Sequence, residues 1–274
     1  PAALRYSDPD RYLDLGRAVT GEVMEQTFAE WRRKGSSCRG ALVWTFQDLA
    51  LGAGWGVIDA NGRPKPAYYA LKRAFRPLQV TVTDEGTNGL AIHVINDLPE
   101  ERSVKLTLTC LRNGQVPVVS GDADLVLDPH STQALNAAQL IGAFFDITYA
   151  YRFGPPSHDV TVVRMVDGET GESLAEAFHF TNAADFHGDA ADIAASLNAL
   201  PAGCFELTLE SARLLRGVHL QCAGYSPSDN WFNLAPAAPK TVLLTPQQTP
   251  EASFAHGPTA VLSALNCVTQ MQVR

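Results

Sequence analysis

Hydrophobic residues in the first part of the chain recur at helical spacing. Between Asp8 and Arg33 the apolar side chains follow a period of three to four residues, which predicts one long amphipathic helix. Ser7 or Asp8 can cap its start, and Pro9 occupies a first-turn position where a missing backbone N–H is tolerated. Gly35 ends the pattern, so we expect a single helix over residues 8–33.

A short apolar run and a second helical segment follow this helix. Ala41–Phe46 is continuously hydrophobic, which is typical of a strand buried on both faces in a parallel sheet. A glycine-rich loop and an Asn-Gly turn at residues 59–64 separate it from Pro66–Phe75, a second predicted helix. One helix–strand–helix unit of this kind cannot bury a lone strand by itself.

After Pro77 the chain alternates between apolar and polar residues, with turn residues at intervals of about ten positions. This spacing predicts antiparallel strands, and residues 78–181 have the size of one immunoglobulin-like sandwich. A polar stretch at residues 181–188 marks a boundary before a second, smaller sandwich. Strands are expected at residues 78–83, 90–95, 103–111, 116–120, 123–127, 147–153, 159–166 and 173–180, then at 191–198, 204–210, 217–224, 231–235, 240–246 and 260–267, with a helical turn at 139–145.

These patterns predict a mostly-β fold, in which two immunoglobulin-like β-sandwiches follow a smaller α/β segment. The predicted domains are residues 1–76, 77–182 and 183–274.

Composition narrows the functional classes. The chain of 274 residues is 46% hydrophobic and 18% charged, which suits a packed core, and its formal net charge of −8 argues against a nucleic-acid partner. No apolar run approaches the roughly 18 residues that span a membrane. The chain starts at Pro1 and not at a methionine, and we interpret it as a piece of something longer, so the lack of a visible signal peptide carries little weight.

The cysteines and histidines favour neither a metal site nor a cofactor site. The five cysteines are odd in number and form no CxxC pair, so we expect inert buried thiols and neither zinc nor disulfides. This favours a reducing compartment, cytoplasmic rather than periplasmic, without defining it. The seven histidines show no metal-ligand spacing, and no cofactor is expected. Glu22 and Glu25 share a helix face, but a solvated face explains them better than acid–base chemistry.

The segment with the candidate binding residues begins at Trp44. A tryptophan near the carboxyl end of a buried strand, followed by Gln47 and Asp48, is how an α/β barrel presents side chains at its active mouth. An indole face also suits stacking on the C–H face of a sugar. The alternative is a core tryptophan with Asp48 capping a loop, and the residues alone do not decide between the two.

These residues resemble the end of the catalytic barrel in glycoside hydrolase family 2, most closely its β-mannosidase-like branch. The resemblance is carried by "LVWTFQD" and by "GWGVIDANGRPKPAYYALKRAF", which includes Trp55. A second stretch, "PSDNWFNLAPAAPKTVLL" at residues 227–244, resembles the signature of the last domain in these enzymes, and "LSALN" at residues 262–266 resembles their closing strand.

The resemblance implies that residues 1–76 are the remnant of a (β/α)8 TIM barrel, and that the parent enzyme is a retaining β-mannosidase-like glycosidase. Both catalytic glutamates of the family would lie upstream of Pro1, so this chain alone is expected to be inactive and no catalytic residue is assigned. Trp44 would be the sugar platform, Gln47 and Asp48 would bind hydroxyls or orient loops, and Trp55 would support them.

Two departures weaken the mannoside assignment. Gln47 stands where these sequences usually have Asn, and Ala50 and Leu51 stand where they have a Trp-Pro pair. A related β-glycoside therefore stays open as the substrate.

The alternative function is a non-catalytic tandem β-sandwich module for glycan binding or structural support. The expected partner is a carbohydrate, with no nucleic acid and no membrane. Self-association is a further possibility, because a lone barrel strand leaves unpaired edges.

Overall fold

The computed structural model describes residues 3–181, 193–247, 258–267 and 270–273. Antiparallel strands dominate it, which confirms the predicted mostly-β fold class. The chain divides into two compact units. The C-terminal unit comprises Pro1–Glu22, Phe46–Ala70 and His187–Arg274, and the central unit comprises Val23–Thr45 and Leu71–Phe186. The predicted boundary near residue 182 lies outside the described residues, and the three-domain division stays a prediction.

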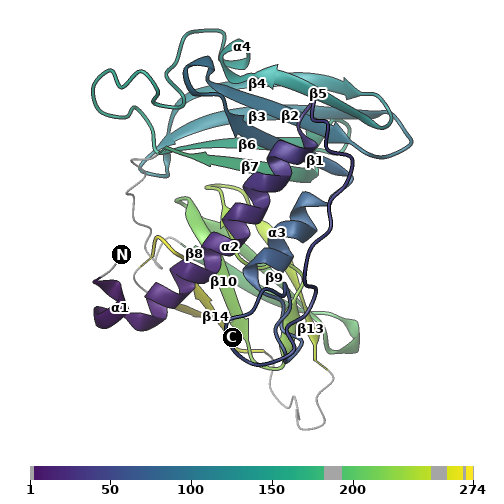
Figure 1. Ribbon diagram of the computed structural model, residues 1–274, viewed down its shortest axis with the longest axis vertical. Helices are drawn as coiled ribbons and strands as arrows, with labels where there is room; N and C mark the ends of the chain where they lie inside the picture. Colours follow the sequence, from purple (N-terminus) through teal and green to yellow (C-terminus); the bar gives the residue numbers. More distant parts are fainter. Residues whose placement is uncertain (1–2, 182–192, 248–257, 268–269, 274) are drawn as a thin grey trace. The chain divides into compact units, whose positions relative to one another are not determined.

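The central unit is a sandwich of two antiparallel sheets, drawn in blue and teal in Figure 1. One sheet has the order β1-β2-β5 and the other the order β4-β3-β6-β7. Their strands are β1 (Leu78–Asp84), β2 (Leu90–Asn96), β3 (Arg102–Arg112), β4 (Val116–Leu127), β5 (Ser131–Asn136), β6 (Val160–Asp167) and β7 (Ser173–Phe180), with the short helices η1 (Gly86–Asn88) and α4 (Ala137–Ile141).

The inward residues of these strands form one core. Leu90 and Ile92 of β2 and Leu106 and Leu108 of β3 are fully buried and belong to the same cluster. Their period of two is the alternation that the sequence showed. Helix α4 packs on β4 at Gly121, where an added Cβ would lie 2.6 Å from the carbonyl carbon of Leu140.

The C-terminal unit contains two further antiparallel sheets, ordered β12-β10-β14-β15 and β11-β13-β9-β8. Leu207 and Leu209 of one sheet and Val218 of the other are fully buried in a shared core. The strands are β8 (Ile193–Ala199), β9 (Phe205–Ser211), β10 (Leu215–Cys222), β11 (Tyr225–Pro227), β12 (Phe232–Leu234), β13 (Lys240–Pro246), β14 (Ala260–Ser263) and β15 (Met271–Val273), with η3 (Pro201–Gly203) and α1 (Leu4–Ser7).

Both predicted long helices form. Helix α2 (Pro9–Arg32) contributes its first part to the C-terminal unit and its last part to the central unit, and α3 (Pro66–Ala74) does the same. In the C-terminal unit, Arg11 of α2 donates to the carbonyls of Leu265 and Cys267. None of the described helices is long and apolar enough to cross a membrane.

The strand predicted at residues 41–46 is wrong. The segment forms no strand, and among the described residues only isolated bridges lie nearby, from Ile58 to Gln47 and to Pro64. Leu42 is 100% exposed and Trp44 is 84% exposed. A strand is stable only when neighbouring strands satisfy its backbone groups, and the described residues provide none here.

A second predicted strand, at residues 147–153, is also wrong. The carboxylate of Asp146 accepts hydrogen bonds from the backbone N–H groups of Tyr151 and Arg152, which closes a turn. Tyr149 and Arg152 both have a φ of 55°. A local aspartate turn therefore overrides the alternating pattern.

The remaining differences are small. Residues 116–120 and 123–127 form the single strand β4, while β5, β11 and β15 were not predicted. The helical turn expected at residues 139–145 is found as α4, at Ala137–Ile141.

Candidate functional site

Residues 46–65 form a tight loop within the C-terminal unit. The backbone N–H groups of Val57 and Ile58 both donate to the carbonyl of Phe46, at 3.0 Å each. The N–H of Asp48 donates back to the carbonyl of Ile58 at 3.0 Å, and that of Lys65 donates to Val57 at 2.9 Å. These paired backbone bonds fix the segment that carries three of the four predicted site residues.

Asp48 holds this loop together from the inside. Its carboxylate, with a side chain only 6% exposed, accepts a hydrogen bond from the N–H of Gly56 at 2.7 Å and pairs with the ammonium of Lys65. Lys65 also donates to the carbonyl of Gly54 at 3.2 Å. The hydrogen bond from Lys65, and next to it that from Gly56, lower the pKa of Asp48, so its carboxylate stays charged at neutral pH.

The glycines beside Asp48 are required by this packing. A Cβ at Gly56 would lie 2.5 Å from the backbone nitrogen of Asp48, and one at Gly54 would overlap its carboxylate. The sequence indicated a tight turn here but not the partner of Asp48. Lys65 belongs to the quoted motif, but no role was assigned to it.

Gln47 and Trp55 present their side chains outward from the same loop. Gln47 is exposed, and its amide donates to the carbonyl of Asp59 at 3.4 Å. Trp55 is 86% exposed. Phe46, Leu49 and Leu51 are exposed as well, so the loop presents mainly apolar side chains on its surface. A polar amide and an aromatic face are therefore available for contact with another molecule.

Trp44, the fourth predicted site residue, belongs to the central unit. Its side chain is 84% exposed, and the peptide bond that joins it to Thr45 is cis. The alternative reading as a core tryptophan does not describe this side chain.

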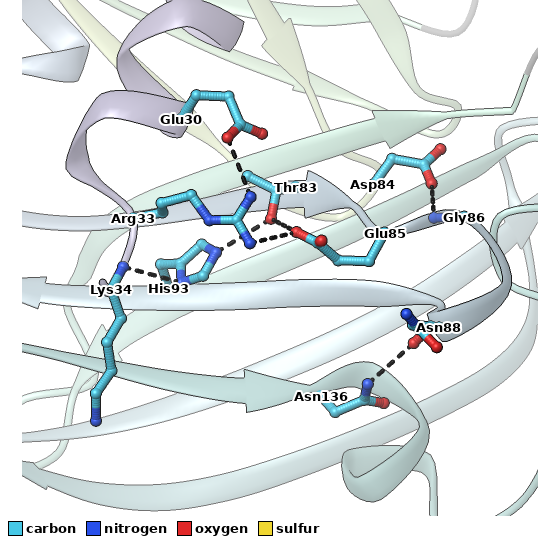
Figure 2. A network of polar contacts seen from close by, with 10 residues as sticks. All are labelled: Glu30, Arg33, Lys34, Thr83, Asp84, Glu85, Gly86, Asn88, His93 and Asn136. Carbon is cyan, nitrogen blue, oxygen red and sulfur yellow. Dashed lines mark hydrogen bonds and ion pairs between the residues drawn. The ribbon is translucent and has the colours of Figure 1, made fainter. Parts of the chain in front are cut away.

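A polar network in the central unit is a second cluster of titratable groups, shown in Figure 2. The guanidinium of Arg33 donates to Glu30 at 3.0 Å and to Glu85 at 2.7 Å. The hydroxyl of Thr83 donates to the same oxygen of Glu85 at 2.7 Å, and it lies 3.1 Å from Nε2 of His93.

The geometry of this network fixes the tautomer of His93. The backbone N–H of Lys34 donates to Nδ1 of His93 at 3.4 Å, which leaves the proton on Nε2. His93 is 2% exposed, and burial, followed by the charge of Arg33, lowers its pKa. Because the histidine is buried and both glutamates are paired with Arg33, the network anchors the end of α2 to β1 and β2 and offers no group to a substrate.

Other candidate groups are also engaged. Glu22 pairs with Arg216 of β10 at 2.5 Å, so it is engaged in an ion pair and does not lie on the fully solvated face that the sequence predicted. Among the described residues no group of three or more His, Cys, Asp or Glu side chains is arranged to hold a metal ion.

The cysteines are all free thiols, but only Cys110 and Cys267 are buried. Cys38, Cys204 and Cys222 are half-buried, so the expectation of five buried thiols is only partly met. Burial raises the pKa of Cys110 and of Cys222 to about 11, which keeps both thiols protonated and unreactive.

Comparison with known proteins finds similarities in sequence and in fold. No family model matches the chain. It is 37% identical over 82 residues to β-mannosidase B of Aspergillus niger and 35% identical over 82 residues to that of Emericella nidulans, which in each case covers 29% of this chain and 10% of the relative. The chain thus spans a small part of the curated relatives it matches.

Solved structures share the fold over nearly the whole chain. The β-D-mannosidase of Dictyoglomus thermophilum superposes with a TM-score of 0.74 at 19% identity, covering 95% of this chain and 30% of that one. The exo-chitosanase of Amycolatopsis orientalis superposes with a TM-score of 0.70 at 15% identity, covering 95% and 34%. The chain is therefore similar in sequence to β-mannosidases over 82 residues, and it shares its fold with a β-D-mannosidase and an exo-chitosanase.

Proposed function

We propose that this chain is the C-terminal part of a retaining glycoside hydrolase that acts on β-mannosides or a related β-glycoside. The sequence relatives are named β-mannosidases, and the solved neighbours of the same fold include a β-D-mannosidase and an exo-chitosanase. The observation that carries the proposal is the exposure of Trp44, at 84%. A tryptophan with a free indole face can stack on a sugar, whereas a buried one cannot.

Each predicted site residue has a role in this proposal. Trp44 is the sugar platform, and Gln47 presents an exposed amide that can bind hydroxyls. Asp48 orients the loop through Lys65 and Gly56, and its engaged carboxylate supports this role over direct contact with a sugar. Trp55, which is 86% exposed, supplies a second apolar face.

The bond-breaking groups come from elsewhere in the proposed parent enzyme. Retaining hydrolysis needs a carboxylic acid that protonates the leaving oxygen and a carboxylate, about 5–5.5 Å away, that attacks the anomeric carbon. Glu22, Glu30 and Glu85 each pair with an arginine, which favours a structural role for these three carboxylates. We therefore assign to this chain a wall of the sugar subsite and no catalytic glutamate.

The test compares this chain with the complete protein on a panel of p-nitrophenyl β-glycosides. The chain alone should release no nitrophenol, and the complete protein should hydrolyse the β-mannoside or a close relative such as the β-glucosaminide. Specific turnover by the chain alone would place the catalytic glutamates within it and overturn the assignment. Absence of turnover on every β-glycoside by a folded complete protein would overturn the proposed function itself.

A further inference from the structure

A cluster of exposed aromatic rings lies on a loop of the central unit, between α4 and β6. Phe144 is 71% exposed, Tyr151 is 42% exposed and Phe153 is 77% exposed. The rings of Phe144 and Tyr151 meet edge to face with centroids 5.5 Å apart, and those of Tyr151 and Phe153 are nearly parallel, at 16°, with centroids 5.8 Å apart. We call these three residues the aromatic platform. Figure 1 shows the loop as a long connection that leaves the sheets.

The backbone under the platform is held in place by specific bonds. Oδ2 of Asp146 accepts from the N–H groups of Tyr151 and Arg152, at 3.1 and 3.2 Å. The hydroxyl of Tyr151 donates to the carbonyl of Thr87 at 3.1 Å, which ties the ring to the turn between β1 and β2.

Further contacts anchor both sides of the loop. Thr148 donates to the carbonyl of Gly86 at 2.7 Å, and the hydroxyl of Tyr149 donates to that of Gly154 at 2.8 Å. Ile147 is buried in the sandwich core at 2% exposure. A surface loop fixed in this way presents its rings in one arrangement, so a ligand meets a preorganised surface.

The size of the platform decides between kinds of partner. An aromatic side chain offers about 200 Å², so the exposed parts of the three rings amount to about 400 Å². A stable protein–protein interface takes about 800 Å² from each partner, twice that area. The platform instead matches the apolar faces of a few consecutive sugar units.

The chemistry at the edge of the platform fits a sugar as well. Arg152 lies between Tyr151 and Phe153 and is exposed, and its guanidinium has no hydrogen-bond or ion-pair partner in the part of the chain that the structure describes. Flat rings can stack on the C–H faces of a pyranose while a free guanidinium donates to its hydroxyls.

We propose that the aromatic platform is an accessory binding site for a neutral β-linked polysaccharide. The choice of a polysaccharide rests on the proposed glycosidase function. The platform would hold the polymer to the protein without taking part in hydrolysis.

The experiment is affinity gel electrophoresis of the full chain through soluble β-1,4-mannan, glucomannan and hydroxyethyl cellulose. At least one polymer should retard the wild type, and Phe153→Ala and Phe144→Ala should each weaken that retardation at least about fivefold, the lower end of what loss of an aromatic stacking partner costs. The matched control is Tyr6→Ala, which removes a ring that is 86% exposed in α1, outside the platform. Circular dichroism confirms that each variant is folded.

Three outcomes would overturn the proposal. In the first, no polymer retards the wild type. In the second, the folded Phe144→Ala/Phe153→Ala double variant is retarded as much as the wild type. In the third, size-exclusion chromatography shows self-association of the wild type that Phe153→Ala abolishes. In the complete protein the double variant should keep its kcat on an aryl glycoside and lose activity only on the polymer. The two proposals can therefore fail separately. If the glycosidase proposal is wrong, the unaltered complete protein does not hydrolyse the aryl glycoside. If only the platform proposal is wrong, that hydrolysis is present and the double variant keeps its activity on the polymer.

Discussion

His158 should make the central unit sensitive to acid. Its imidazole is 1% exposed, beside the ring of Phe145 at 5.2 Å, with the hydroxyls of Ser157 and Thr161 at 3.1 and 3.4 Å. Burial, and next to it the charge of His179, lower its pKa from 6.5 to about 4, while the carbonyl of Ile147 and the carboxylates of Asp159 and Asp146 oppose the shift.

The size of the effect follows from this pKa. The folded state resists protonation of His158 and the unfolded state does not, so the unfolded chain binds the proton first as the pH falls. The contribution of neutral His158 to the free energy of unfolding is therefore fully present above pH 6.5 and is lost progressively as the pH falls through 4. At about 1.36 kcal/mol for each pH unit, the free energy of unfolding should fall by about 3 kcal/mol over this window.

The assay is urea unfolding between pH 7.5 and 4, with hydrogen exchange of peptides from β6 to report on the central unit. His158→Gln removes the titrating group and should flatten the dependence, whereas the control His130→Asn, at an exposed histidine, should not. If His158→Gln does not fold, NMR titration of the wild-type imidazole measures the pKa directly. A pKa near 6.5, or a pH dependence that His158→Gln leaves unchanged, would refute the reasoning.

Two further predictions concern packing and charge. Gly56→Ala should destabilise the loop by about 1–3 kcal/mol, because the new methyl group overlaps Asp48, and hydrogen exchange in residues 46–65 should become faster. The control is Gly40→Ala, which should have little effect because nothing lies within 4 Å of its Cβ. Equal effects of the two substitutions would contradict the packing argument. Arg33→Gln and Glu85→Gln should show a coupling energy of about 0.5–1 kcal/mol in a double-mutant cycle of unfolding free energies, because the ion pair is partly exposed. Strictly additive effects of the two substitutions would show that the contact contributes nothing.

Local patterns predicted the helices and most strands, because these depend on periodicity. Helix α2 (Pro9–Arg32) was expected at nearly its observed bounds. The apolar run at residues 41–46 was misread because a buried strand is defined by its neighbours, which the described part of the chain does not supply. Strand β5 was missed because its sequence, STQALN, lacks a clear apolar alternation and its pairing with β2 holds it in place.

The candidate site was predictable only in part. Motifs singled out Trp44 and Trp55, and both are exposed. The pairing of Asp48 with Lys65 joins residues 17 positions apart, and it depends on the backbone bonds that fold the loop back on itself. Periodicity carries no information on such a contact. The aromatic platform escaped notice for a similar reason, because Tyr151 and Phe153 were assigned to a strand that does not form and Phe144 to a helical turn.

The most direct test of the account is the kcat/KM of the complete protein on p-nitrophenyl β-mannoside, or on the β-glycoside it hydrolyses best, with and without the indole of Trp44. If Trp44 is the sugar platform, Trp44→Ala should lower kcat/KM at least about tenfold, which corresponds to about 1.4 kcal/mol of lost transition-state stabilisation, while Tyr6→Ala leaves it unchanged. A folded Trp44→Ala protein with wild-type kcat/KM would contradict the claim that this chain forms a wall of the sugar subsite.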